Sequence, residues 1–210
     1  MESRGLFYAR NMKKVLLLHG WTNKRPEGHW LRLTAAELRS RGHQVWYPQF
    51  PNPDRPNPTD WQELLRQESN MMDEAAGEAK IVVAHSLGTT NWLYGALNNL
   101  FSKPFDRALL VAPPDPTLTD ETDGIEGEQL DLSNPLLAQQ ARRWAKELTV
   151  IASDNDKWLP RGIQIYEQPL QTKPNIFPGA GHFSLDDGWG PWPGLISWIE
   201  SGNQEDLLRR

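Results

Sequence analysis

The chain has 210 residues, a formal net charge of −5 at pH 7 and no cysteine. This length accommodates one domain with a sizeable hydrophobic core. The absence of cysteine excludes disulfides, thiolate metal sites and cysteine nucleophiles, and the acidic balance argues against non-specific binding of nucleic acid. No stretch resembles a secretory signal or reaches the roughly 18 apolar residues of a membrane span. We therefore expect a cytoplasmic protein that binds neither nucleic acid nor membrane.

Strands and helices are expected to alternate along the chain. Continuous apolar runs such as 13–20 predict buried parallel strands. The proline-rich segment 49–58 predicts an extended loop, because proline donates no hydrogen bond to a sheet. The helix over 59–77 is expected to begin with Thr59 or Asp60 as its N-cap. The expected strands are 13–20, 43–48, 79–85, 107–113, 148–153 and 171–179, and the expected helices are 27–42, 59–77, 87–101, 136–147, 160–168 and 191–201.

Three segments are expected to stand apart from this alternation. Residues 1–12 are expected to form a flexible N-terminal extension ahead of a single domain over 13–201. Residues 202–210 are expected to form a polar tail that frays. Segment 115–131 carries seven acidic residues and no Lys or Arg, so we expect it to be a solvated excursion and not a strand.

The alternation of strands and helices predicts an α/β fold, with a mostly parallel sheet and helices on both faces. Ligands of such folds bind at the carboxyl ends of the strands. Four polar clusters follow predicted strands, namely 19–21, 85–88, 153–156 and 181–182. We therefore expect the functional site to be assembled from these four clusters.

Ser86 lies between a predicted strand and a predicted helix, in the stretch AHSLG. A sharp turn there pushes the serine hydroxyl out of the sheet and points the N–H of Leu87 at the reacting oxygen. Such a turn needs small residues two positions before and after the serine. Gly88 meets this demand, and Ala84 adds one methyl group. The alternative is a serine that only caps the helix, but the groups a nucleophile requires follow later in the chain.

His182 is the one histidine that follows Ser86, in the loop GAGHFS. A serine hydroxyl becomes a good nucleophile when a base takes its proton, and triads on sheets of this type run in the order Ser, Asp or Glu, His. The acid is expected after strand 148–153, where Asp154 and Asp156 both lie. A carboxylate there would fix the tautomer of the imidazole and stabilise its charged form. The pattern by itself leaves both aspartates open.

The loop after the first strand is expected to supply a second backbone donor for the oxyanion. In the stretch HGWTN, Gly20 lets the backbone pass close to the site. The N–H of Trp21 is our first choice of donor and that of Thr22 the second. His19 and His85 are expected to be structural, donating hydrogen bonds to nearby carbonyl groups.

Other residues are expected to surround the site without taking part in the chemistry. His29, in the stretch GHW, begins a predicted helix and is expected to reach the rim in a structural role. The histidines lack the spacing of a metal site, so no metal or other cofactor is expected. Because the acidic excursion is short and polar, we expect an open site with little preference for long lipids. The residues expected to line the pocket are Thr22, His29, Trp158, Trp189 and Trp192.

Six motifs resemble, in their order and spacing, those of a known family. They are HG-W near the N-terminus, GHWL, FPNPD-P before a helix that opens with Trp61, AHSLG, ASDNDKWLP and GAGHF. Over 15–199 the chain resembles the small α/β-hydrolases related to retinoblastoma-binding protein nine and the bacterial YdeN-like proteins. The resemblance implies an α/β-hydrolase fold with a minimal lid or none. It assigns the nucleophile to Ser86, the base to His182 and the acid to Asp156.

The resemblance also implies serine hydrolase activity, usually on small esters. We therefore expect a carboxylesterase that acts on a small-molecule ester through an acyl-enzyme intermediate. A thioesterase or acyltransferase is an alternative, because it would use the same three side chains. A non-enzymatic binding module on a hydrolase scaffold is the other, because the acidic segment 115–131 could contact a basic protein partner.

Overall fold

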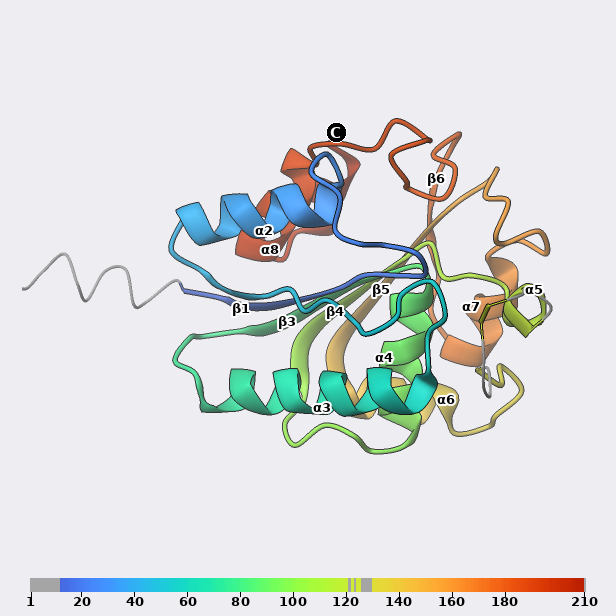
Figure 1. Cartoon of the computed structure of the whole chain (residues 1–210), viewed down its shortest axis with the longest axis horizontal. Coiled ribbons are helices and arrows are strands. Elements are labelled where there is room, and N and C mark those ends of the chain that lie inside the picture. The colour runs from blue at the N-terminus through green and yellow to red at the C-terminus, as the bar shows by residue number, and fades with distance from the viewer. Residues whose placement is uncertain (1–11, 121, 123, 126–129, 210) are drawn as a thin grey trace, which may run out of the picture.

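Six strands form one sheet in the order β2-β1-β3-β4-β5-β6 (Figure 1). The computed structural model describes residues 12–120, 122, 124–125 and 130–209. Every neighbouring pair of these strands is parallel, which confirms the predicted class of fold. The strands are β1 (Lys14–Leu18), β2 (Gln44–Trp46), β3 (Lys80–His85), β4 (Phe105–Val111), β5 (Ala145–Ser153) and β6 (Asn175–Phe177).

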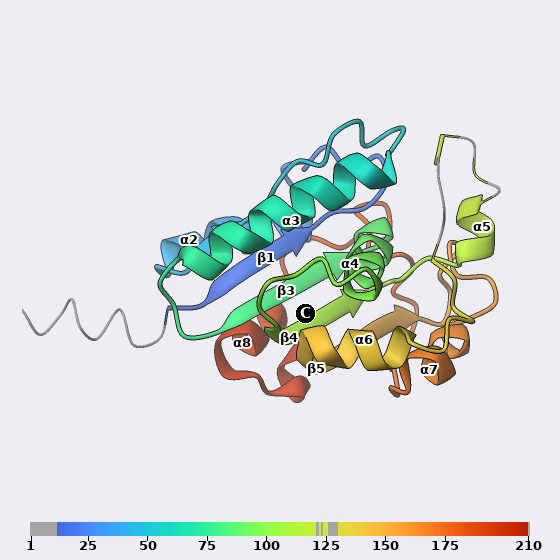
Figure 2. The same cartoon turned by 90° about the horizontal axis from the view of Figure 1, so that it is seen from below.

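Helices cover both faces of the sheet. Figures 1 and 2 show α2 and α8 on one face and α3, α4 and α6 on the other, with α5 and α7 near the carboxyl ends of the strands. This arrangement leaves the carboxyl ends of the central strands for the loops that follow them. The helices are α2 (Trp30–Ser40), α3 (Pro58–Glu74), α4 (Leu87–Leu97), α5 (Pro116–Asp120), α6 (Leu137–Trp144), α7 (Gln164–Leu170), α8 (Pro193–Ser201) and a 3₁₀ helix, η1 (Gln204–Leu208).

The central strand β3 shows why the sheet is buried on both faces. Successive side chains of a strand point to opposite faces. Val82 and Ala84 therefore pack in the core beneath α3, α4 and α6, whereas Ile81 and Val83 pack beneath α2 and α8. All four side chains are fully buried. Four successive apolar residues in one strand are stable only in such a two-sided environment.

The boundary between α6 and β5 lies earlier than predicted. The helix ends at Trp144 and the strand begins at Ala145, whereas the sequence pattern placed that boundary at residue 148. Ala145 pairs with Phe105, the first residue of β4. Pairing with a neighbouring strand therefore extends β5 into residues whose own spacing is helical.

The start of α3 also differs from the prediction. Asn57 is the N-cap, and its Oδ1 accepts hydrogen bonds from the N–H groups of Thr59 (2.9 Å) and Asp60 (3.2 Å). The expectation that Thr59 or Asp60 caps the helix is wrong. Pro58 occupies the first helical position, where its missing N–H is not needed.

Helix α7 starts later than predicted, at Gln164 instead of residue 160. A turn precedes it, in which the N–H of Gly162 donates to the carbonyl of Leu159 (2.8 Å). Gly162 has a φ of +74°, a left-handed conformation that interrupts a right-handed helix. The helix predicted over 160–168 therefore forms only after this glycine.

The C-terminal tail does not fray as predicted, because it packs beneath α8. Leu207 is 1% exposed, and its carbonyl accepts a hydrogen bond from Nε1 of Trp192 (3.0 Å). The N–H of Gly194 donates to the carbonyl of Arg209 (3.0 Å). The predicted N-terminal extension, residues 1–12, lies outside the described residues except for Met12.

The acidic excursion is anchored at both ends. Asp115 is 1% exposed and accepts a hydrogen bond from Nε of Arg161 (2.6 Å). Leu130 is 2% exposed and lies in the core. The expectation of a solvated segment is therefore wrong for these two residues. The buried carboxylate of Asp115 is paired with the half-exposed Arg161, and apolar burial holds Leu130. Residues 121, 123 and 126–129 lie outside the described residues.

Candidate active site

Ser86 sits on a sharp turn between β3 and α4. Its backbone has φ 54° and ψ −129°, a region that residues other than glycine rarely occupy. A Cβ placed on Gly20 would lie 2.6 Å from Cβ of Ser86, and one on Gly88 would lie 2.8 Å from the carbonyl oxygens of Leu18 and His19. The strained turn is therefore possible only because Gly20 and Gly88, which pack against it, have no side chains.

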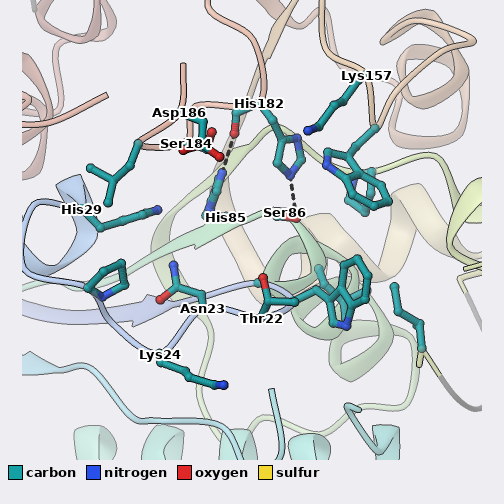
Figure 3. A pocket seen from close by; sticks show the side chains of 18 residues that line it. Thr22, Asn23, Lys24, His29, His85, Ser86, Lys157, His182, Ser184 and Asp186 are labelled. Carbon is teal, nitrogen blue, oxygen red and sulfur yellow. Dashed lines mark hydrogen bonds between the residues drawn. The ribbon is translucent and has the colours of Figure 1, made fainter. Parts of the chain in front are cut away.

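A hydrogen-bonded chain connects Ser86 to His182 and Asp156. Nε2 of His182 lies 2.7 Å from Oγ of Ser86 (Figure 3). Nδ1 of the same ring lies 2.8 Å from Oδ2 of Asp156. The carboxylate of Asp156 is fully buried, and its Oδ1 accepts a hydrogen bond from the N–H of Trp158 (2.8 Å). The fold thus brings together three side chains that lie far apart in the sequence.

The two aspartates after β5 are held in different places. Oδ1 of Asp154 accepts a hydrogen bond from the N–H of Gly179 (2.7 Å) on the loop after β6, and this residue is exposed. Asp156 instead turns inward and reaches the imidazole of His182. The geometry favours Asp156 as the partner of the histidine, which is the assignment that the resemblance implied.

Two backbone N–H groups beside Ser86 are available to a ligand. Leu87 is the first residue of α4, and the N–H groups in the first turn of a helix have no partner within the helix. The N–H of Thr22 already donates to the carbonyl of Pro53 (2.7 Å). Among the described residues, no hydrogen bond engages the N–H of Trp21. The loop after β1 therefore offers the amide of Trp21, the first choice, and not that of Thr22.

His19 and His85 are buried and neutral. Burial lowers the pKa of His19 to about 4, and one ring nitrogen, Nδ1, lies 2.9 Å from the carbonyl of Gly20 while Nε2 accepts the N–H of Phe50 (2.9 Å). Burial lowers the pKa of His85 as well. Its Nε2 lies 2.8 Å from the carbonyl of His182 (Figure 3). Both rings hold backbone of the site in place, as their predicted structural role requires.

Asp187 is part of the site and was missed by the sequence analysis. Its Oδ2 accepts hydrogen bonds from the N–H of His182 (2.8 Å) and from Oγ of Ser184 (2.7 Å). A Cβ on Gly181 would lie 2.2 Å from Oδ1 of Asp187, so glycine is needed where the loop passes the carboxylate. The only signal in the sequence is an aspartate that precedes a glycine, which is typical of many turns.

A cavity of about 470 Å³ opens over Ser86 (Figure 3). It is lined by Thr22, His29 and Trp158, as predicted, and also by Trp21 and Ile125. Three charged residues, Lys24, Lys157 and Asp186, line it as well. The rings of Trp21 and Trp158 meet edge to face at 5.6 Å, and form an aromatic wall on one side. Since Ile125 belongs to the acidic excursion, that segment contributes to the site instead of leaving it wholly open.

Trp189 and Trp192 do not line this cavity, contrary to our expectation. They are 1% and 2% exposed, and their rings lie 5.0 Å apart in the core beneath α2 and α8. Trp189 also packs on Phe183 at 4.4 Å. Their indole N–H groups donate to the carbonyls of Ala180 (2.9 Å) and Leu207 (3.0 Å). Burial of aromatic area therefore decides their position.

No group of three or more His, Cys, Asp or Glu side chains is arranged to hold a metal ion in the described part of the chain. No helix among the described residues is long and apolar enough to cross a membrane.

Comparison with solved structures identifies the fold. The chain is similar to the ydeN gene product from B. subtilis (TM-score 0.70, 23% identity, covering 90% of this chain and 98% of that one). It is similar to a YdeN-like hydrolase from Pectobacterium atrosepticum (TM-score 0.65, 19% identity, 98% of each chain). It is also similar to the esterase domain of a Rhodothermus marinus protein (TM-score 0.56, 18% identity, 86% and 82%). The fold is that of the α/β-hydrolases.

The family is shown by the sequence itself. No curated protein sequence matches the chain. The model of the serine hydrolase family, however, matches residues 15–201, a span that runs from the second residue of β1 to the end of α8. It also contains Ser86, Asp156 and His182. The chain therefore belongs to the serine hydrolase family.

Proposed function

We propose that the protein is a carboxylesterase that hydrolyses small esters with Ser86 as nucleophile. The observation that carries this proposal is the continuous chain of hydrogen bonds from Asp156 through His182 to Ser86, with distances of 2.8 and 2.7 Å. A serine that only caps a helix needs neither a histidine at its hydroxyl nor a buried carboxylate behind that histidine. The esterase domain among the similar structures supports the choice of an ester as substrate.

The reaction proceeds in two halves. Oγ of Ser86 attacks the ester carbonyl carbon while its proton passes to Nε2 of His182, and Asp156 stabilises the resulting imidazolium. The C–O bond to the alcohol then breaks, and the alcohol leaves with the proton from His182. A water molecule attacks the acyl-enzyme with His182 again as base, and releases the carboxylic acid and free Ser86.

The oxyanion formed in each half is stabilised by backbone N–H groups. Leu87 at the start of α4 and Trp21 on the loop after β1 are the two donors. The free N–H of Trp21 and the engaged N–H of Thr22 support this choice. The positive end of the α4 dipole adds to the same stabilisation. Each such donor contributes about 10²- to 10³-fold to kcat in serine hydrolases.

A panel of p-nitrophenyl esters with increasing acyl length, run beside a fluorophosphonate probe, tests the proposal. Wild-type protein is expected to hydrolyse the short esters and to be labelled. The Ser86→Ala variant is expected to lose about 10⁴-fold or more in kcat and to lose labelling.

Ser184 provides a matched control, because it also lines the cavity and its hydroxyl donates to Asp187. The Ser184→Ala variant is expected to retain labelling. Labelling that persists in Ser86→Ala, or that disappears only in Ser184→Ala, would show that Ser86 is not the nucleophile.

A further inference from the structure

His29 places a buried imidazole at the wall of the cavity. It is the N-cap of α2, and its Nδ1 accepts a hydrogen bond from the N–H of Leu31 (3.2 Å). The residue is 4% exposed, and it lines the cavity over Ser86. Nδ1 of His29 is therefore engaged in capping α2, and only Nε2 remains for another partner.

The cap determines which nitrogen of His29 carries the proton. Burial lowers the pKa of His29 to about 4, so the ring is neutral at pH 7. Because Nδ1 accepts a hydrogen bond, the single proton of the neutral ring must be on Nε2. No acceptor from the described part of the chain is bonded to this Nε2–H, and Figure 3 shows the His29 ring pointing into the cavity. Although the residue is only 4% exposed, this N–H opens on the cavity, where water or a ligand can accept its hydrogen bond.

Asn23 presents a second donor on the same side of the cavity. Its Oδ1 accepts a hydrogen bond from the N–H of Arg25 (2.7 Å), which assigns the orientation of the amide. Figure 3 shows its Nδ2 pointing into the cavity on the same side of Ser86 as His29, with Lys157 on the other side. The cavity thus has two neutral donors on one side.

We propose that His29, together with Asn23, binds an acceptor oxygen of the substrate beside the reacting ester. The substrate class is then an ester whose acyl or alcohol part carries an ether, carbonyl or hydroxyl oxygen close to the carbonyl that Ser86 attacks. This inference rests on the proposed esterase function, and it makes His29 a residue that determines specificity. His29 and Asn23 supply no charge that would offset desolvation of an anion. Lys24, which lines the cavity next to Asn23, is paired with Asp54 at 2.6 Å, and Lys157 lies on the other side. This side of the cavity therefore favours an uncharged acceptor.

Two variants of His29 separate its contact with the substrate from its role as helix cap. In His29→Asn, the amide oxygen takes the place of Nδ1 and keeps the cap, but the donor at Nε2 is lost. In His29→Gln, the amide nitrogen reaches the position of Nε2 and keeps the donor, but the cap is lost. A structural role predicts that the Gln variant is impaired, whereas a role in binding predicts that the Asn variant is.

Pairs of esters that differ by one oxygen provide the readout. On the acyl side, p-nitrophenyl methoxyacetate is compared with p-nitrophenyl butyrate. On the alcohol side, 2-methoxyethyl acetate is compared with n-butyl acetate. In each pair an oxygen replaces a methylene at nearly constant shape. The measured quantity is the ratio of kcat/KM within a pair, and a comparison of that ratio between variants cancels the intrinsic reactivity of the esters.

We expect His29→Asn to lower this ratio about two- to tenfold in one of the two pairs, as the loss of one hydrogen bond predicts. The pair that responds shows whether the oxygen lies on the acyl or the alcohol side. His29→Gln is expected to keep most of the ratio while its melting temperature falls. Equal ratios in wild type and His29→Asn for both pairs would overturn the inference.

Failure of the proposed function gives a different result. In that case p-nitrophenyl butyrate is not hydrolysed, or its hydrolysis does not depend on Ser86. Hydrolysis of butyrate that depends on Ser86, with ratios that do not respond to His29→Asn, would leave the esterase proposal intact and remove only the specificity proposal.

Discussion

The loops after β3 and β5 bring Ser86 and Asp156 to the same end of the sheet, but they hold them in different ways. The turn at Ser86 is held by its backbone, which has a φ of 54° and closely packed glycines on both sides. The loop at Asp156 has an ordinary backbone and holds its side chain through hydrogen bonds to Trp158 and His182. Steric fit therefore places the proposed nucleophile, and polar contacts place the proposed acid.

This difference separates the effects that substitutions should have. A residue placed by steric fit tolerates no added atom nearby, so changes around it should destabilise the fold as well as the reaction. A residue placed by hydrogen bonds can be replaced by an isostere that keeps its shape, so changes there should alter the reaction more than the fold. The predictions below test this contrast, from the largest effect to the smallest.

The largest effect is expected at the acid. Asp156→Asn keeps the shape of the side chain but removes the charge that stabilises the imidazolium of His182. We expect kcat for p-nitrophenyl acetate to fall about 10²- to 10⁴-fold, with little change in melting temperature. Asp154→Asn is the matched control, because an amide oxygen can still accept the N–H of Gly179. A greater loss of kcat in Asp154→Asn would show that the acid is misassigned.

Lowering the pH should reduce the free energy of unfolding, because His19 is buried in its neutral form at the end of β1. The folded-state pKa of His19 is about 4, below its ordinary value of 6.5, so the unfolded chain binds more protons between these pH values. The contribution of His19 to stability is therefore full above pH 6.5 and is lost as the pH falls toward 4, by about 3 kcal/mol in total.

Urea unfolding at pH 7.5 and pH 4.5 measures this loss. His85 and His29 have lowered pKa values for the same reason, burial, so the wild type should lose more stability than His19 alone accounts for. In His19→Gln the drop between the two pH values should be smaller than in the wild type. An equal drop in both proteins would mean that His19 is not the group that titrates.

A single methyl group at Gly88 should disturb the turn. In Gly88→Ala the new Cβ would meet the carbonyl oxygens of Leu18 and His19 at 2.8 Å, and these backbone atoms cannot move away freely. We expect a loss of about 1–3 kcal/mol in the free energy of unfolding and a lower kcat. Gly190→Ala is the control, because its nearest neighbour would lie at 3.9 Å. Equal stability of the two variants would contradict steric placement of Ser86.

The smallest effect is expected at Ala84, the position two residues before the nucleophile. Ala84→Gly puts the smallest residue at this position, but it loosens the end of β3 and removes a buried methyl group. We expect a loss of about 0.5–1 kcal/mol in urea unfolding and no gain in kcat. A higher kcat would show that the methyl group of Ala84 strains the turn.

Most of the architecture could be predicted from local patterns. Apolar runs identified the inner strands, because burial on both faces requires such runs. The short edge strands β2 and β6 are only partly buried. The alternation of strands with helices identified a parallel sheet. The predictions were wrong where contacts with residues distant in the sequence determine the local structure. The start of β5 depends on its pairing with Phe105, and the order of the tail depends on its contact with Trp192. Neither partner is adjacent in the sequence.

The sequence by itself determined the order of Ser86, the aspartates and His182, and the small residues that a sharp turn requires. Only the tertiary structure separated Asp154 from Asp156 by contact, placed Trp189 and Trp192 in the core, and showed that the N–H of Thr22 is already engaged. Order and residue size are properties of the chain. Burial and hydrogen bonding depend on partners that only folding brings within reach.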